Sequence, residues 1–402
     1  MRESWKTILL KDACKVFADG DWIESKDQSS EGIRLVQTGN IGFGYFKDKE
    51  DKSRYISEKT FHRLNCTEIL PGDLLVSRLP DPVGKSCIIP EINSKMITGV
   101  DCTIIRPKDN FLSNFLCYFQ MSDKYLKDVQ SGVSGATRQR ISRKNLGLIE
   151  IPLPPLPEQQ RIVAILDEAF ATIAKAKANA QQNLQNAKEL FESYLQGVFE
   201  NKGEGWEEKT LGEIGKPSMC KRILKHQTST TGEIPFYKIG TFGKTPDAFI
   251  SKEIYDEFRT KYSFPKKGDI LISASGTIGR RVRYDGEPAF FQDSNIVWIN
   301  NDEKQILNDY LYVFYEFCDW QPSKGATISR LYNSNLTSIK IVFPKSIGEQ
   351  KTILKKIDAV STEAKKLESI YQQKINDLEE LKKSVLQKAF AGELKTDKVV
   401  AV

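Results

Sequence analysis

The chain has 402 residues, a length that corresponds to two or three domains, each large enough to bury a core of its own. Its composition, 40% hydrophobic and 28% charged, is that of an ordinary globular protein, and no apolar run approaches the roughly 20 residues of a membrane span. The formal net charge of +6 permits a polyanionic partner without requiring one. The first residues, Met1 to Lys6, lack a signal-peptide core, so we expect a cytoplasmic protein without a membrane partner.

Cysteine and histidine usage argues against a disulfide framework and a zinc site. The seven cysteines are scattered and form no Cys-x-x-Cys pair, so we expect reduced and mostly buried thiols. The two histidines, His62 and His226, cluster neither with each other nor with cysteines, and we therefore predict no metal site.

The first region, residues 1–157, mixes short β-type runs with turn signals. Leu74 to Ser77 follows a Gly-Asp pair and predicts a buried strand, as does Ser86 to Ile89, whereas Phe115 to Phe119 predicts a short helix. The mixture predicts an α+β globular unit. The run Gly39 to Gly44 resembles a glycine-rich nucleotide loop, but no βαβ unit with a following acidic residue frames it.

Residues 158–203 are predicted to form one long helix. Prolines between Pro152 and Pro157 mark its start, and Gly203 marks its end. Apolar residues alternate in spacing between four and three, which predicts a heptad seam. Its main positions are Ile162, Leu166, Ile173 and Leu190. A helix of about 40 residues is roughly 60 Å long, so the seam needs an equally long partner.

The remaining chain repeats this order. Region 204–347 predicts a second α+β unit, with strands at Ile270 to Ser273 and Asn295 to Ile299 and a helix at Tyr310 to Tyr315. Region 348–402 predicts a second long helix, which ends near Gly392, and a C-terminal tail. Its seam positions are Ile353, Ile357, Leu367, Leu378 and Leu381.

An internal repeat links the two halves. The segment 158–167 returns as 349–358, and the same offset of 191 residues carries Glu189-Leu190 onto Glu380-Leu381. The duplication predicts two units related by a pseudo-two-fold axis, with the two helices paired antiparallel. A coiled-coil stalk for oligomerisation is the alternative, but a stalk needs no globular unit after each helix.

One position within each predicted seam is polar. Asn183 and Lys374 are again 191 residues apart. One hypothesis is that they lie near the crossing centre and set the register of the pair. The alternative is a solvated break in an imperfect seam.

Several loops of the globular units carry groups that suit nucleic acid. Arginine can bind guanine edges bidentately, glutamine can bind adenine, and hydroxyl and lysine groups suit phosphates. Each residue alone is a weak signal, because a loop arginine is more often merely solvated. The candidate DNA-binding residues are Arg78, Lys85, Thr137, Arg138, Gln139, Arg140, Ser275, Thr277, Arg280, Arg281, Thr327 and Arg330.

No catalytic residues are predicted. The sequence contains no G-x-x-x-x-G-K-[ST] loop and no Asn-Pro-Pro-Tyr-type run of the amino-methyltransferases. Pro80-Asp81-Pro82 resembles part of a nuclease site but lacks a partner carboxylate and lysine at useful spacing, so a turn is favoured.

The doubled arrangement resembles the specificity subunit of type I restriction–modification systems over essentially the whole chain. The run from Pro152 to Ile162 has the pattern Pro-Leu-Pro-Pro-Leu-x-Glu-Gln-x-x-Ile at the start of a long helix. A degenerate copy of the same pattern begins at Phe343. The Gly-Ala-Thr run before each helix, the Gly-Asp-Leu/Ile-Leu strand and the Leu-Gln-x-x-Phe helix end also resemble that family.

The resemblance implies two target-recognition domains, 1–157 and 204–347, each reading half of a split DNA site, with the helices as a spacer. It implies that two modification subunits dock on the helices and that restriction subunits join them. S-adenosylmethionine, ATP and Mg would then serve those partners, and this chain would bind no cofactor. The alternatives are a protein-interaction scaffold, which would show no sequence preference among DNA duplexes, and a degenerate methyltransferase, which would bind S-adenosylmethionine.

Overall fold

The computed structural model describes residues 5–135, 137–200, 203–323 and 329–394. The chain divides into two compact units: unit 1 comprises residues 1–182 and 372–402, and unit 2 comprises residues 183–371. The division falls inside both long helices, so each helix contributes one part to each unit. Among the described residues, no helix combines the length and apolarity needed to cross a bilayer.

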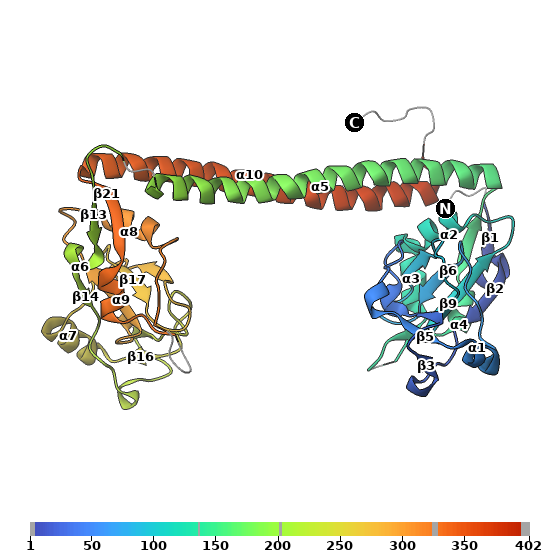
Figure 1. The fold of residues 1–402 in the computed structure, drawn as a ribbon, viewed down its shortest axis with the longest axis horizontal. Coiled ribbons are helices and arrows are strands. Elements are labelled where there is room, and N and C mark those ends of the chain that lie inside the picture. The colour runs from blue at the N-terminus through green and yellow to red at the C-terminus, as the bar shows by residue number, and fades with distance from the viewer. Residues whose placement is uncertain (1–4, 136, 201–202, 324–328, 395–402) are drawn as a thin grey trace. The chain divides into compact units, whose positions relative to one another are not determined.

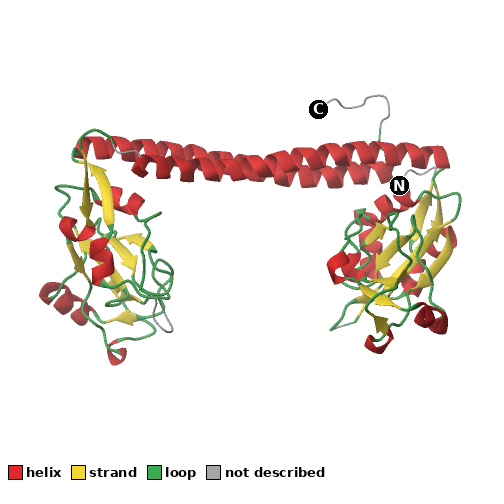
Figure 2. Cartoon of the chain, viewed as in Figure 1, coloured by secondary structure: helices red, strands yellow, loops and turns green. Residues whose placement is uncertain are grey.

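Unit 1 is an α+β unit joined to parts of the two long helices (Figures 1 and 2). Its strands are β1 (Lys6–Leu9), β2 (Cys14–Asp19), β3 (Gln28–Ser29), β4 (Ile33–Val36), β5 (Arg54–Ile56), β6 (Leu74–Ser77), β7 (Ser86–Ile88), β8 (Met96–Thr98), β9 (Cys102–Pro107), β10 (Val133–Ser134), β11 (Arg140–Ile141) and β12 (Glu150–Leu153). Its helices are α1 (Glu58–Leu64), α2 (Ser113–Gln120), α3 (Asp123–Ser131), α4 (Arg143–Gly147) and parts of α5 (Leu156–Glu200) and α10 (Ile347–Ala391).

Unit 2 contains a shorter set of the same kinds of element. Its strands are β13 (Trp206–Thr210), β14 (Lys216–Ser218), β15 (Ile234–Tyr237), β16 (Phe249–Ile250), β17 (Ile270–Ser273), β18 (Arg281–Arg283), β19 (Phe290–Phe291), β20 (Ile296–Asn300) and β21 (Lys340–Pro344). Its own helices are α6 (Leu211–Ile214), α7 (Lys252–Lys261), α8 (Asn308–Phe314) and α9 (Asn333–Ser338).

The sheets of the two units have the same connectivity. Unit 1 has a sheet in the order β2-β9-β6-β7, and unit 2 has the matching order β14-β20-β17-β18. In each unit a parallel pair follows, β4 with β8 and β15 with β19. In each unit the first strand pairs antiparallel with the strand that precedes the long helix, β1 with β12 and β13 with β21. The duplication predicted from the sequence therefore extends to the sheet topology.

The predicted strands and short helices are confirmed. Strands β6 and β17 have the predicted bounds, and all eight of their residues are buried, because neighbouring strands and helices cover both faces of each central sheet. Helix α2 contains the predicted run Phe115 to Phe119, and α8 contains the predicted run from Tyr310 except its last residue, Tyr315, which caps the helix. The cysteines are free and all but Cys318 are buried; burial raises the pKa of the Cys102 thiol to about 12.

In unit 1, α5 begins against the end of α10. Ile162 and Leu166 of α5 share one buried core with Leu386 and Phe390 of α10 and with α2. The Phe390 ring lies 5.4 Å from that of Phe115 and 5.3 Å from that of Phe119, between ring centres. Further along α5, Lys177 pairs with Glu379 of α10. The two helices are therefore antiparallel in this unit.

In unit 2, the opposite ends of the same helices meet. Phe199 of α5 packs against the core of this unit together with Ile353 and Leu354 of α10. The Phe199 ring centre lies 5.1 Å from that of Tyr310 and 4.5 Å from that of Phe317. The predicted antiparallel pairing thus holds in this unit as well.

The predicted seam is partly buried. Ile162, Leu166, Ile173 and Ile357 are buried, and Ile353, Leu367 and Leu378 are half-buried. Leu190 and Leu381, in contrast, are 57% and 48% exposed. After Ala187 the covered face of α5 passes to Phe191 and Leu195, because a helix of 3.6 residues per turn drifts away from a strict heptad.

The hypothesis that Asn183 and Lys374 set the register is wrong, because both side chains are exposed. In unit 2 the neighbouring Leu184 is half-buried, and in unit 1 the neighbouring Ile375 is half-buried. The covered stripe therefore stays apolar, and the polar residues lie beside it.

Candidate nucleic-acid interface

A tight turn after the central strand places one predicted cation at the same point of each unit. In unit 1 the Ser77 amide donates to the Lys85 carbonyl at 2.9 Å and the Gly84 amide donates to the Ser77 carbonyl at 2.8 Å. In unit 2 Ser273, Arg280 and Gly279 repeat both hydrogen bonds, at 2.8 and 3.0 Å. Lys85 and Arg280 are therefore structural equivalents, although their surrounding sequences differ.

The glycine of this turn is required in both units. Gly84 has φ of +85° and Gly279 has φ of +82°, a region that disfavours other residues. A Cβ atom would lie 2.8 Å from Val129 in the first case and 2.1 Å from Trp320 in the second. Each turn is thus packed tightly, and it fixes the backbone position of the cationic residue that follows the glycine, Lys85 or Arg280.

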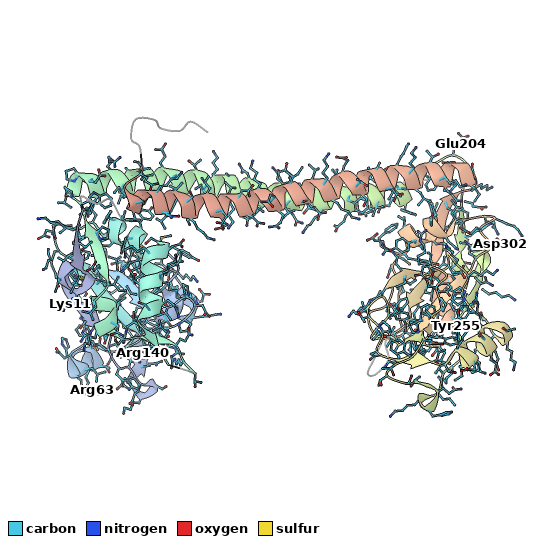
Figure 3. The ribbon with its side chains drawn as sticks, turned by 180° about the vertical axis from the view of Figure 1, so that it is seen from behind. Lys11, Arg63, Arg140, Glu204, Tyr255 and Asp302 are labelled. Carbon is cyan, nitrogen blue, oxygen red and sulfur yellow. The ribbon has the colours of Figure 1, made fainter. Side chains whose placement is uncertain are left out.

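A second pair of predicted arginines is also equivalent. The Arg78 carbonyl accepts from the Ile141 amide at 3.2 Å, and the Ala274 carbonyl accepts from the Leu331 amide at 2.8 Å. Arg140 and Arg330 each precede that donor and therefore lie at matching positions. Figure 3 shows Arg140 on the part of unit 1 that is remote from α5 and α10.

In unit 1 four arginines gather around two carboxylates. Asp101 lies 3.4 Å from Arg138 and 3.5 Å from Arg140, between its carboxylate oxygens and their Nη2 atoms. Asp19 lies 3.3 Å from Nη2 of Arg78 and 3.7 Å from Nε of Arg143. We call these six residues the arginine cluster. It has two more positive than negative charges, an excess that suits a polyanion.

Arg78 differs from the other predicted cations because only 4% of its side chain is exposed. Its Nη2 also donates to the Val100 carbonyl, so its guanidinium is engaged inside the unit. Burial is the largest influence on the pKa of Arg78 and lowers it, while the Asp19 carboxylate acts in the opposite direction. In this arrangement Arg78 holds Asp19 inside the unit, and its guanidinium is not accessible to a ligand.

In unit 2 neutral groups hold the equivalent arginine. Arg330 donates through Nη2 to the Ser294 carbonyl at 3.2 Å and to its Oγ at 2.8 Å. The buried Ser275 hydroxyl donates to Oδ1 of Asn295 at 2.8 Å, and Arg280 donates to the Phe242 carbonyl at 3.0 Å. Ser275, Arg280 and Arg330 thus lie on one connected set of loops.

Other predicted residues have different surroundings. Arg281 is bound by Glu316 at 2.6 Å and lies over the Tyr312 ring of α8, 4.5 Å from its centre. The Arg281 side chain on β18 therefore points toward α8, which the sequence did not indicate. Thr137, Arg138, Gln139 and Thr277 are exposed. Thr327 lies outside the described residues.

Sequence reasoning missed several charged groups of this region. Asp19, Asp101 and Arg143 come from distant segments, and Lys47 adjoins Lys85 closely enough that both burial and the Lys47 charge lower the pKa of Lys85. No local motif marks them, because only the fold brings them together. The run Gly39 to Gly44 is a turn: the Gly42 and Gly44 amides donate to the Tyr45 and Ser86 carbonyls, both at 2.8 Å.

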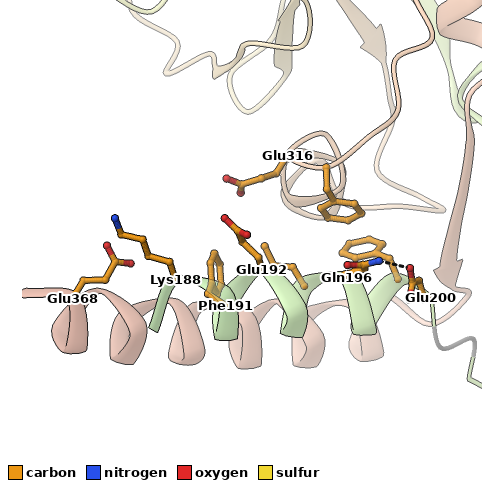
Figure 4. A pocket seen from close by; sticks show the side chains of 10 residues that line it. Lys188, Phe191, Glu192, Gln196, Glu200, Glu316 and Glu368 are labelled. Atoms are coloured by element: carbon orange, nitrogen blue, oxygen red, sulfur yellow. Dashed lines mark hydrogen bonds between the residues drawn. The ribbon is translucent and has the colours of Figure 1, made fainter. Parts of the chain in front are cut away.

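Unit 2 also carries a cleft of about 860 Å³ beside α5 (Figure 4). Its apolar lining comes from Phe191, Leu195, Phe199 and Phe317. The charged residues around it include Glu192, Glu316 and Glu368 and a single lysine, Lys188. Within the described parts of the chain, no group of three or more His, Cys, Asp or Glu side chains is placed to hold a metal ion.

Comparison with known proteins gives a consistent family. The model of the type I restriction modification DNA specificity domain matches residues 2–185 and again 203–380. A type I restriction enzyme specificity subunit of Haemophilus influenzae is 44% identical over 263 residues, covering 64% of this chain and 67% of the relative.

Solved structures agree in fold. A chain from work on complex assembly and conformational transition of the type I R-M system superposes with a TM-score of 0.76 at 19% identity, covering 98% of this chain and 99% of the other. The HsdS subunit from Thermoanaerobacter tengcongensis gives 0.64 at 18% identity, with 98% coverage of both chains. The chain therefore belongs to the family of type I restriction–modification DNA specificity proteins and is a specificity subunit with two DNA-recognition domains.

Proposed function

We propose that each unit reads one half of an asymmetric, split site in duplex DNA and that the chain performs no chemistry itself. The observation that carries this proposal is the placement of Arg140 and Arg330, with Lys85 and Arg280, at equivalent points of a duplicated scaffold. Exposed guanidinium groups can bind guanine edges bidentately, and lysine suits phosphates.

The asymmetry of the proposed site follows from what surrounds these cations. Arg140 is paired with a carboxylate, whereas Arg330 is held by a serine. Because the same scaffold presents different chemistry in the two units, we expect two different half-site sequences. A palindromic site would require matching surroundings.

We further propose that the long helices set the gap between the half-sites and dock two modification subunits. Helices α5 and α10 each continue without interruption from one unit into the other, which suits a spacer. Leu190 in unit 2 and Leu381 in unit 1 are exposed at the same position of the repeat. Large exposed apolar side chains at repeated positions favour two copies of one partner.

In this proposal all chemistry belongs to partners in a cytoplasmic complex. The modification subunits would use S-adenosylmethionine, and the restriction subunits would use ATP and Mg. The cleft of unit 2, with its apolar floor and acidic rim, suits a partner segment that combines apolar and basic side chains.

The test is selection of bound duplexes from a random library by the full chain, co-expressed with its modification subunit, at two salt concentrations. We expect an asymmetric sequence with a fixed gap and a steep loss of affinity with salt. Arg140→Ala and Arg330→Ala should each relax one half of the selected site. Deleting seven residues from each helix should change the gap. Selection without sequence preference would contradict the proposal, as would binding of S-adenosylmethionine by the isolated chain.

A further inference from the structure

Asp101 occupies the centre of the exposed part of the arginine cluster. Its two carboxylate oxygens contact different arginines, Arg138 at 3.4 Å and Arg140 at 3.5 Å. The Asp101 side chain is 29% exposed, and those of Arg138 and Arg140 are 71% and 42% exposed. One carboxylate thus holds two solvent-accessible cations by contacts long enough for a well-placed hydrogen-bond acceptor to replace.

Backbone hydrogen bonds identify the matching residue in unit 2 as Asn295. The Asp101 carbonyl accepts from the Arg78 amide at 2.9 Å, and the Asn295 carbonyl accepts from the Ala274 amide at 2.7 Å. Arg78 and Ala274 both follow the central strand directly. The two positions therefore differ mainly by one negative charge, because aspartate and asparagine have nearly the same shape.

A carboxylate at this point changes how the arginines meet DNA. Phosphate contacts are equally available on every sequence, whereas base-edge contacts occur only at the correct bases. Asp101 repels phosphates and competes with them for Arg138 and Arg140. Sites that offer well-placed base acceptors can still replace it, since bidentate arginine–guanine contacts are strong and directional.

We propose that Asp101 is a specificity-determining residue that positions Arg138 and Arg140 and suppresses their binding to non-specific DNA. Unit 2, with Asn295 at the matching position, lacks this restraint and binds its half-site with a larger contribution from phosphates. The inference rests on the proposed function, because it assigns a role within the half-site that unit 1 reads.

The chain supplies its own matched variants. Asp101→Asn gives unit 1 the residue of unit 2, and Asn295→Asp makes the reverse exchange. The Asn295 Oδ1 atom accepts from Ser275, a hydrogen bond that an aspartate can keep. Asp109→Asn is the charge control, because Asp109 pairs with Lys15 beyond the opposite end of β9 and is 91% exposed.

The experiment measures binding of the full chain, co-expressed with its modification subunit, to its selected duplex and to a scrambled one. For Asp101→Asn we expect about fivefold to tenfold tighter binding to the scrambled duplex at 0.1 M salt, and a salt dependence steeper by about one counterion. Repeated selection should show about tenfold weaker base preference in one half of the site only.

The reciprocal variants assign the effect. Asn295→Asp should weaken binding to the scrambled duplex and leave the half affected by Asp101→Asn unchanged, and Asp109→Asn should alter neither half. If Asp101→Asn leaves the base preferences unchanged, or weakens them equally in both halves of the site, the proposal is overturned. The proposed function still stands in that case if the wild-type chain selects a split site with a fixed gap. If the wild-type chain selects no sequence, the proposed function fails and this inference fails with it. Thermal melting of each variant separates these results from loss of fold.

Discussion

Gln159 and Gln350, which are 191 residues apart, make the same three hydrogen bonds with completely buried side chains. Nε2 of Gln159 donates to the Asn110 and Pro154 carbonyls, both at 2.9 Å, and its Oε1 accepts from the Leu112 amide at 2.9 Å. Gln350 donates to the Gln305 and Pro344 carbonyls at 2.8 Å and accepts from the Leu307 amide at 2.9 Å. Each glutamine thus fastens the start of a long helix to the globular part of its own unit.

Replacing Gln159 by alanine should destabilise unit 1 by about 2–4 kcal/mol, because it leaves the Leu112 amide and the Asn110 and Pro154 carbonyls without this buried partner. Hydrogen exchange of the first turns of α5 and of the Leu112 amide measures the effect. Gln160→Ala is the control, since that neighbouring side chain is exposed. Equal protection in the two variants would show that the hydrogen bonds contribute no net stability.

The aspartates that precede the two central strands should respond oppositely to neutralisation. Asp73 and Asp269 each accept from a backbone amide at 2.8 Å, from Leu70 and Lys266. Asp73 also binds Arg106 through two hydrogen bonds of 2.8 Å. Asp73→Asn should therefore destabilise unit 1 by about 3 kcal/mol, since it breaks an ion pair whose carboxylate is buried. Chemical denaturation with hydrogen exchange of β6 as a local probe measures this change.

Asp269→Asn should instead stabilise unit 2 at neutral pH. Burial raises the pKa of Asp269 above its usual value. Protonation therefore favours the folded state: this contribution to stability is complete below the ordinary aspartate pKa near 4 and is lost as the pH rises through the raised value. In the variant the stability of unit 2 should therefore fall less as the pH rises. Hydrogen exchange of β17 at pH 5 and pH 8 measures this difference. A loss of protection at both pH values would mean that the carboxylate is needed as an acceptor.

The duplicated scaffold could be predicted from the sequence, whereas the recognition surface could be predicted only in part. Strands such as β6 and helices such as α2 are local apolar runs that the sequence shows directly, and the run at Glu158-Gln159 marks a helix start. The arginine cluster depends on Asp19 and Asp101, which lie far from Arg140 in the chain. Neither carboxylate has a local signature, because each has its role only after β2 pairs with β9.

Two details of the helices also required the structure. The heptad pattern predicted Leu190 and Leu381 as seam residues, but the covered face drifts past both. The polar residues Asn183 and Lys374 suggested a register device because the same strict spacing was assumed. A rotation of a fraction of a turn along a helix cannot be determined from periodicity alone.

Arg78→Ala and Arg140→Ala should differ in kind. The buried Arg78 binds Asp19 and the Val100 carbonyl, so its loss should destabilise unit 1 by about 3 kcal/mol and weaken DNA binding only indirectly. Arg140 is 42% exposed, so its loss should leave stability nearly unchanged and reduce selectivity for the preferred duplex. Thermal melting and competition by non-specific duplex separate these effects. Normal stability with lost selectivity in Arg78→Ala would assign that residue directly to DNA.

Leu190→Glu and Leu381→Glu should each remove one docked modification subunit. Both side chains are exposed at the same repeat position. A partner that covered a glutamate there would have to bury its charge without a compensating cation, which would weaken docking. Each single variant should yield complexes with one modification subunit and the double variant complexes with none, as measured by native mass spectrometry of co-expressed subunits. Leu148→Glu is the control, because Leu148 is also 48% exposed but lies outside the long helices. Full occupancy in the double variant would place the docking surface on another face of α5 and α10.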